Sequence, residues 1–101
     1  MAEVVWSRRA SQDLLQACEY LERDSLAYAC YFADEVMKTF ESAAKQPFVG
    51  AMVPEYGEEH FRERRVGSYR LMYEVHRDAI YVVAIVHGAR AMPPERSAFS
   101  E

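Results

Sequence analysis

Apolar residues recur at helical spacing twice in the first half of the chain. The first stripe follows a short β-rich run at residues 4–6 and predicts an amphipathic helix over residues 8–23, with Ser7 as its N-cap. The second stripe predicts a helix that begins after Ser25 and ends before Pro47, because the residue preceding a proline leaves the helical region. With only a short joint between them, the two helices are expected to form an antiparallel hairpin. The two stripes consist of Ala10, Leu14, Ala17, Cys18 and Leu21, and of Ala29, Phe32, Ala33, Val36, Phe40 and Ala43.

The period of the apolar positions changes to two in the second half of the chain. Residues 69–76 alternate between two sets of side chains, which predicts a half-buried strand. Residues 80–86 form a nearly continuous apolar run, which is typical of a strand in the interior of a sheet. A further strand is expected over residues 61–66, with Gly67 as the turn after it and residues 77–78 as the turn between the last two strands.

These elements define the expected fold. Residues 47–60 contain two prolines and two glycines and no clear period, so they predict a long loop of the kind that often carries function. Residues 91–101 are expected to be a weakly ordered tail unless a partner binds them. Residues 1–101 are therefore predicted to form a single α+β domain with the element order β-α-α-β-β-β. An N-terminal strand precedes a helical hairpin, which packs on one face of a small, mainly antiparallel sheet.

The composition is that of a globular domain. Of the 101 residues, 50% are hydrophobic and 28% are charged, which excludes a disordered segment. No apolar run approaches the roughly 18–20 residues of a membrane span. Residues 1–9 lack the apolar stretch of a signal peptide. We therefore expect a soluble cytoplasmic protein that does not associate with a membrane.

The charges are unevenly distributed along the chain. The net charge is −4, yet residues 60–90 contain six arginines against three acidic residues, together with all three histidines. An acidic protein with one arginine-rich segment does not have the charge of a general nucleic-acid-binding protein. This segment is therefore either a local anion site or the solvated face of a sheet.

Common metal and catalytic motifs are absent from the sequence. No Cys-x-x-Cys or His-x-x-x-His spacing occurs, and no glycine-rich phosphate loop or nucleophile elbow is present, so we expect neither a metal nor a small-molecule cofactor. Cys18 and Cys30 lie symmetrically about Asp24, which allows them to approach each other across the joint of the hairpin. The simpler interpretation is a pair of reduced, buried thiols.

Strand alternation divides the candidate residues of the segment 61–66 between two faces. Phe61, Glu63 and Arg65 are expected on one face, and Arg62 and Arg64 on the other.

Arg70 lies in the middle of the next expected strand, among apolar residues, where a charge needs a partner. That partner is either a carboxylate, with Glu55, Glu63 and Glu74 as candidates, or a phosphate, which the guanidinium fork fits well. His87 ends the last strand and is either a general acid or base or a hydrogen-bonded structural histidine.

Taken in order along the chain, several short motifs resemble a known family. The match spans residues 3–94 and rests on the ordered set, with the Gly-Ser-Tyr-Arg-Leu-x-Tyr strand and the His-Gly-Ala-Arg end as its most specific parts. The sequence resembles the RelE/ParE superfamily, the toxin halves of bacterial type II toxin–antitoxin and plasmid-stabilisation modules. The matching residues are Val4-Val5-Trp6-Ser7, Ala10, Asp13-Leu14, Tyr20-Leu21, Asp24-Ser25, Pro47, Val53-Pro54-Glu55, Arg62-Glu63, Val66 to Tyr73, and Val86 to Arg90.

The resemblance implies one of two activities. RelE-like members, including the YoeB-like branch, are ribonucleases that cut messenger RNA on the ribosome. ParE-like members share the fold, inhibit DNA gyrase and block replication. Both kinds are held inactive by an antitoxin whose C-terminal segment wraps the toxin. The resemblance therefore implies a protein antitoxin as partner, and either DNA gyrase or the ribosome with its mRNA as target.

The nuclease pattern is only partly kept. Under that interpretation the catalytic set is Glu55, Arg70, His87 and Arg90, where the resemblance gives Glu55 the role of the YoeB-like glutamate and the arginines contact phosphate. The two strand lysines of RelE-like enzymes map onto Phe61 and Glu63, and the catalytic tyrosine has only Phe99 near its position.

These departures favour a ParE-like, non-enzymatic toxin over the ribonuclease. A degenerate, non-toxic antitoxin-binding module is the third alternative. In each case acidic residues of the antitoxin are expected to pair with the arginines Arg62, Arg64, Arg65, Arg70 and Arg90.

Overall fold

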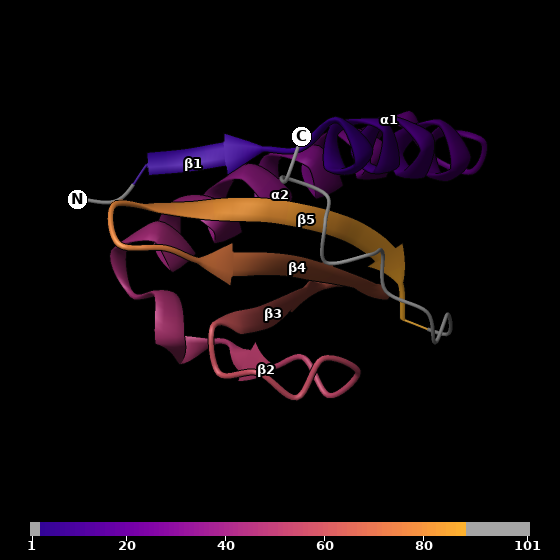
Figure 1. Cartoon of the computed structure of the whole chain (residues 1–101). Coiled ribbons are helices and arrows are strands. Elements are labelled where there is room, and N and C mark those ends of the chain that lie inside the picture. Colours follow the sequence, from indigo (N-terminus) through magenta and orange to yellow (C-terminus); the bar gives the residue numbers. More distant parts are fainter. Residues whose placement is uncertain (1–2, 89–101) are drawn as a thin grey trace.

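The computed structural model describes residues 3–88, which form a five-stranded sheet and a helical hairpin (Figure 1). The predicted β-α-α-β-β-β order is confirmed, with one short strand added after the hairpin. The expected weakly ordered tail, residues 91–101, lies outside the described residues. The elements are β1 (Glu3–Trp6), α1 (Arg8–Glu22), α2 (Leu26–Lys45), the 3₁₀ turn η1 (Pro47–Val49), β2 (Ala51–Met52), β3 (Phe61–Val66), β4 (Tyr69–Val75) and β5 (Ala79–His87).

The sheet is mainly antiparallel, as predicted. Its strand order is β1-β5-β4-β3-β2, and only the pair of β1 with β5 is parallel. The hairpin leads from β1 at one edge of the sheet toward β2 at the other edge, and β3 and β4 follow before the chain returns to pair β5 with β1. In Figure 1, α2 passes behind the sheet, so one face of the sheet is covered by the hairpin. Neither helix of the described chain is long and apolar enough to cross a membrane.

Both predicted helix caps are present. The Ser7 hydroxyl accepts the Ala10 N–H at 3.0 Å, and the Ser25 hydroxyl accepts the Tyr28 N–H at 3.0 Å. Each cap satisfies one of the backbone donors that a helix leaves unpaired at its start. Ser7 is also buried, and its hydroxyl donates to the Val83 carbonyl of β5 at 3.2 Å. It therefore joins the start of α1 to the sheet.

Replacing Ser7 by alanine is expected to destabilise the protein by about 1–2 kcal/mol, because one buried acceptor and one helix donor lose their partner. Urea unfolding followed by circular dichroism measures this loss. Ser25→Ala is the matched control, since it removes the same cap at an exposed position, and it should cost less, about 0.5–1 kcal/mol. A smaller effect at Ser7 than at Ser25 would contradict the bridging role.

The main core lies between the hairpin and the sheet. Phe32, Val36 and Phe40 of α2 are fully buried there against Leu71 and Tyr73 of β4. Phe40 touches Trp6 and Tyr73 edge to face, with ring centroids 5.3 and 6.3 Å apart. These rings connect β1, α2 and β4 in one contact chain.

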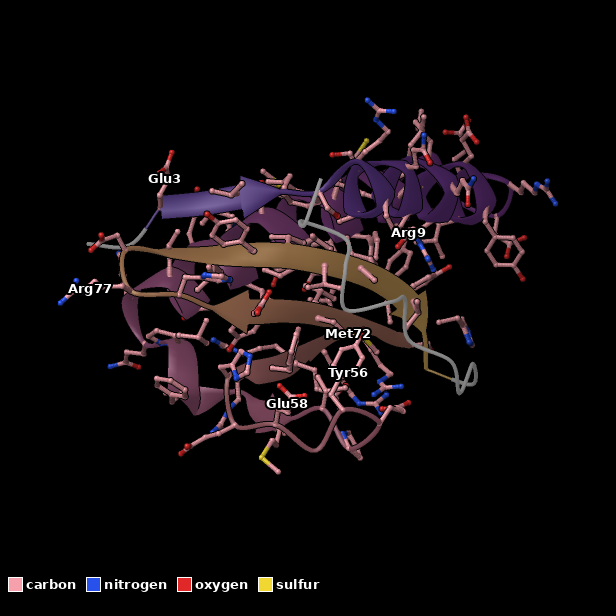
Figure 2. The ribbon with its side chains drawn as sticks, in the orientation of Figure 1. Glu3, Arg9, Tyr56, Glu58, Met72 and Arg77 are labelled. Atoms are coloured by element: carbon pink, nitrogen blue, oxygen red, sulfur yellow. The ribbon has the colours of Figure 1, made fainter. Side chains whose placement is uncertain are left out.

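A second apolar cluster occupies the opposite face of the sheet, and a bulge in β5 helps to build it. Met72 pairs with Ala84 whereas Tyr73 pairs with Val82, so Val83 is the extra residue. Both Val83 and Ala84 therefore turn to the face away from the hairpin. The cluster consists of Val53, Phe61, Met72, Val83, Ala84 and Val86, with Tyr56 packed against it. In Figure 2, Met72 and Tyr56 lie on this side, in front of the sheet.

Candidate functional site

The predicted alternation along β3 is confirmed for the residues whose contacts define a face. Phe61 belongs to the second apolar cluster, and Glu63 is bonded to Arg70 on the same side. Arg62 and Arg64 point the other way, toward the hairpin side, where Arg64 Nη1 donates to Ser42 Oγ of α2 at 3.4 Å.

Arg70 is held between two carboxylates, and we call Glu55, Glu63 and Arg70 the Arg70 network. Arg70 Nη1 and Nη2 donate to Glu55 Oε2 and Oε1, each at 2.8 Å, which is a bidentate pair. Arg70 Nε donates to Glu63 Oε1 at 2.7 Å, and Nη2 lies 2.6 Å from the same oxygen. Only 6% of the Arg70 side chain is exposed. The expectation that Arg70 is paired with a carboxylate is therefore confirmed, and Arg70 has two such partners, Glu55 and Glu63.

The electrostatics of the network follow from these contacts. Hydrogen bonds from Arg70 hold the pKa of Glu55 below its ordinary value. Hydrogen bonds to Glu55, followed by the hydrogen bond and charge of Glu63, raise the pKa of Arg70 above its ordinary value, although burial opposes this. The network places two carboxylates around one guanidinium, so its formal charge is −1. An incoming phosphate would meet more negative charge than the guanidinium offsets.

The lowered pKa of Glu55 predicts a pH dependence of stability. Its ionised form is favoured in the folded state, so this stabilisation is complete above the ordinary glutamate pKa and is lost as the pH falls through the lower, folded value. The urea midpoint of the wild type is therefore expected to fall more steeply below about pH 4.5 than that of Glu55→Gln. Parallel midpoints for the two proteins from neutral to acidic pH would show that this carboxylate contributes nothing through its charge.

The remaining described arginines of the segment differ in accessibility. Arg62 donates to the carbonyl oxygens of Glu59 at 2.7 Å and of Gly50 at 3.1 Å, so it fastens the long loop to β3. Arg64 is half-buried beside α2, and Arg65 is exposed. The Arg65 guanidinium lies against Gly88, where an added Cβ would come within 2.8 Å of Nη1. Arg65 is thus the most accessible of these three cations.

His87 lies on the other side of the sheet from the Arg70 network. It pairs with Tyr69, whose ring packs on Phe32 of the hairpin, and the His87 and Tyr69 rings meet at 5.3 Å. Arg70 pairs with Val86, which belongs to the cluster on the opposite face. His87 instead lines an open cleft of about 470 Å³ beside α1. The other residues of this cleft are Arg9, Asp13, Gln16, Ala17, Tyr20, Tyr69, Ile85 and Val86.

The four candidate nuclease residues are therefore not brought together in the described part of the chain. Glu55 and Arg70 meet, but they neutralise each other, and His87 is on the far face. Arg90 lies outside the described residues. Glu74, the third candidate partner of Arg70, instead lies between His60 at 3.5 Å and His76 at 3.2 Å.

Asp13 is a polar contact that the sequence analysis did not identify. Its carboxylate accepts the Ile85 N–H of β5 at 3.0 Å and pairs with Arg9. β1 ends at Trp6, so the outer edge of β5 beyond that point is bonded by side chains of Ser7 and Asp13. The only signal in the sequence is one acidic residue beside the apolar stripe of the first helix. Among residues 3–88, no group of three or more His, Cys, Asp or Glu side chains is arranged to hold a metal ion.

Comparison with models of known protein families shows which family the chain belongs to. The family model for the ParE toxin of the type II toxin–antitoxin system, parDE, matches residues 4–92. The chain belongs to the ParE toxin family. The resemblance to the RelE/ParE superfamily is confirmed by this match, and the protein is a type II toxin by family.

A solved structure supports the fold of this ParE family member. A chain of the chromosomal ParDE toxin–antitoxin system from P. aeruginosa matches with a TM-score of 0.68 and 17% sequence identity, over 86% of this chain and 96% of that chain. At this identity the match concerns the fold alone. A comparison with curated proteins gave no match.

Proposed function

We propose that this ParE-family protein inhibits DNA gyrase in the cytoplasm, blocks replication and is held inactive by a cognate antitoxin. The family match supports a toxin of the ParE branch. The Arg70 network is the observation that carries the choice of mechanism. Of the residues that a RelE-like ribonuclease would aim at the scissile phosphate, Arg70 is occupied by Glu55 and Glu63, and His87 lies across the sheet.

The two positions that carry lysines in RelE-like enzymes support the same proposal. Phe61 is 2% exposed and packs on Tyr56 with ring centroids 4.4 Å apart. Glu63 is an acid whose carboxylate is engaged by Arg70. A positioned acid or base contributes about 10²–10⁴-fold to such a reaction, and one electrostatic donor contributes about 10²–10³-fold. A site that lacks both the positioned acid or base and the electrostatic donor is a poor catalyst of RNA cleavage.

The antitoxin interface is part of the proposal. Arg65 is exposed, and we place the acidic contact of the antitoxin first on this residue. Arg62 and Arg64 lie on the same strand with their side chains toward the hairpin and follow as secondary contacts. Arg90 stays in the proposed set. Arg70 is expected to contribute little, because its donors already bind two carboxylates inside the protein.

Pulse labelling tests the proposed function in cells. We would induce the protein without antitoxin and follow thymidine and methionine incorporation during the first minutes. The proposal predicts that thymidine incorporation falls first while translation continues, followed by filamentation. If methionine incorporation falls first and transcripts are cut, the protein is a ribonuclease and the proposal is wrong. Unimpaired growth at high expression would identify a degenerate antitoxin-binding module.

A further inference from the structure

The hairpin brings its two cysteines to the same level. Its joint is short, with α1 capped at Arg23 and α2 at Ser25. Cys18 and Cys30 each lie six residues from Asp24, on opposite sides of that joint. In an antiparallel helix pair, residues equally far from the connection lie level with each other.

The packing of the hairpin allows close contact at this level. Ala17 and Ala29 are buried beside the two cysteines, and such small side chains let helix axes approach. Cys18 is half-buried and packs against the core, whereas Cys30 is exposed. Burial, and after it the charges of Cys30 and Glu22, raise the pKa of the Cys18 thiol, which agrees with the placement of Cys30 at the level of Cys18.

We propose that Cys18 and Cys30 are a redox-active dithiol, which a peroxide oxidises to an intramolecular disulfide across the hairpin. This modification is independent of the gyrase-directed function.

The two steps of the oxidation depend on the different exposure of Cys30 and Cys18. The thiolate of exposed Cys30 attacks one peroxide oxygen, which gives a Cys30 sulfenic acid, and the other oxygen leaves as water after taking a proton. The Cys18 sulfur then attacks the Cys30 sulfur, the S–S bond forms, and the sulfenic oxygen leaves as a second water. Two thiols lose two electrons and two protons, and the peroxide is reduced to two waters. Cys18 suits the second step, because burial keeps it from meeting peroxide first.

The expected product is a reversible covalent link between α1 and α2. The new bond closes only the short loop of residues 18–30, so the oxidised protein should unfold at a moderately higher urea concentration than the reduced one. The thiol pool of a reducing compartment returns it to the dithiol.

Intact-mass measurement of the full chain tests this proposal. The reduced protein is treated with hydrogen peroxide and then alkylated with N-ethylmaleimide under denaturing conditions. We expect a monomer that has lost both alkylatable thiols and is about 2 Da lighter, and that recovers both thiols in dithiothreitol. Retention of both thiols, or oxidation only to covalent dimers, would overturn the proposal.

Two single variants assign the order of the sulfurs. In Cys18→Ser, Cys30 should be trapped by dimedone as a sulfenic acid, because no second thiol can reach it. In Cys30→Ser, Cys18 should stay alkylatable for the time in which the wild type loses both thiols. Equally fast loss of the thiol in Cys30→Ser would contradict the assignment of Cys30 as the first sulfur. The main result uses the wild-type protein and so does not depend on the folding of either variant.

Discussion

Replacing Arg70 by methionine is expected to lower the free energy of unfolding by about 3–5 kcal/mol. The substitution keeps an apolar stem in place but leaves Glu55 and Glu63 facing each other without a cation. The side chains of Glu55 and Glu63 are only 26% and 11% exposed, so water cannot fully replace the lost hydrogen bonds. Urea unfolding at neutral pH, followed by circular dichroism, measures the loss. Since small domains have about 5–15 kcal/mol of stability in total, this variant should be close to unfolding.

Two controls isolate the cause of that loss. Arg77→Met makes the same change at the exposed turn between β4 and β5, where Figure 2 shows Arg77 at the end of the sheet, and should stay within about 0.5 kcal/mol of the wild type. Combining Arg70→Met with Glu55→Gln and Glu63→Leu removes all three charges and should recover much of the stability. If Arg70→Met alone unfolds at the wild-type midpoint, the network does not stabilise the fold.

Phe40→Ala is expected to cost a similar amount, about 3–5 kcal/mol. Phe40 is 1% exposed and is the ring of α2 that touches both Trp6 of β1 and Tyr73 of β4. Its removal leaves a cavity where the hairpin meets two strands of the sheet. Thermal and urea unfolding both report this loss, and Trp6 fluorescence should shift as its neighbour disappears.

Phe48→Ala is the matched control for this core substitution. Phe48 is 54% exposed, and its ring centroid lies 5.0 Å from the Arg62 guanidinium. Its loss should therefore cost less than about 1 kcal/mol. Equal costs at the two positions would contradict the assignment of Phe40 to the main core.

The local features of the fold could be predicted because short-range patterns determine them. Ser7 and Ser25 each precede an apolar stripe and cap the helices as expected. The two-residue strand β2 and the parallel pairing of β1 could not be predicted. A strand as short as β2 has no readable period, and the pairing of β1 depends on β5, which is distant in the sequence.

Only part of the candidate site could be predicted from the sequence, and the bulge in β5 explains why the face of His87 could not. The sequence indicates that Arg70 needs a carboxylate, but it cannot choose among three glutamates whose distances depend on the path of the loop. With strict alternation along β5 from Ile80, the side chain of His87 would lie on the face of Arg70. The extra residue Val83 reverses the alternation, so His87 turns toward the hairpin instead. The extra residue in β5 therefore places His87, the candidate acid or base, and Arg70, the candidate phosphate contact, on opposite faces of the sheet.

We propose above all that the Arg70 network belongs to a gyrase-directed toxin and not to a ribonuclease. The most direct test combines purified protein with DNA gyrase, ATP and relaxed plasmid, with relaxation by a type I topoisomerase as the control. We expect that supercoiling is lost as the protein is titrated in, while the control reaction is unchanged and mRNA in a translation extract stays intact. Unimpaired supercoiling together with cleaved mRNA would contradict it.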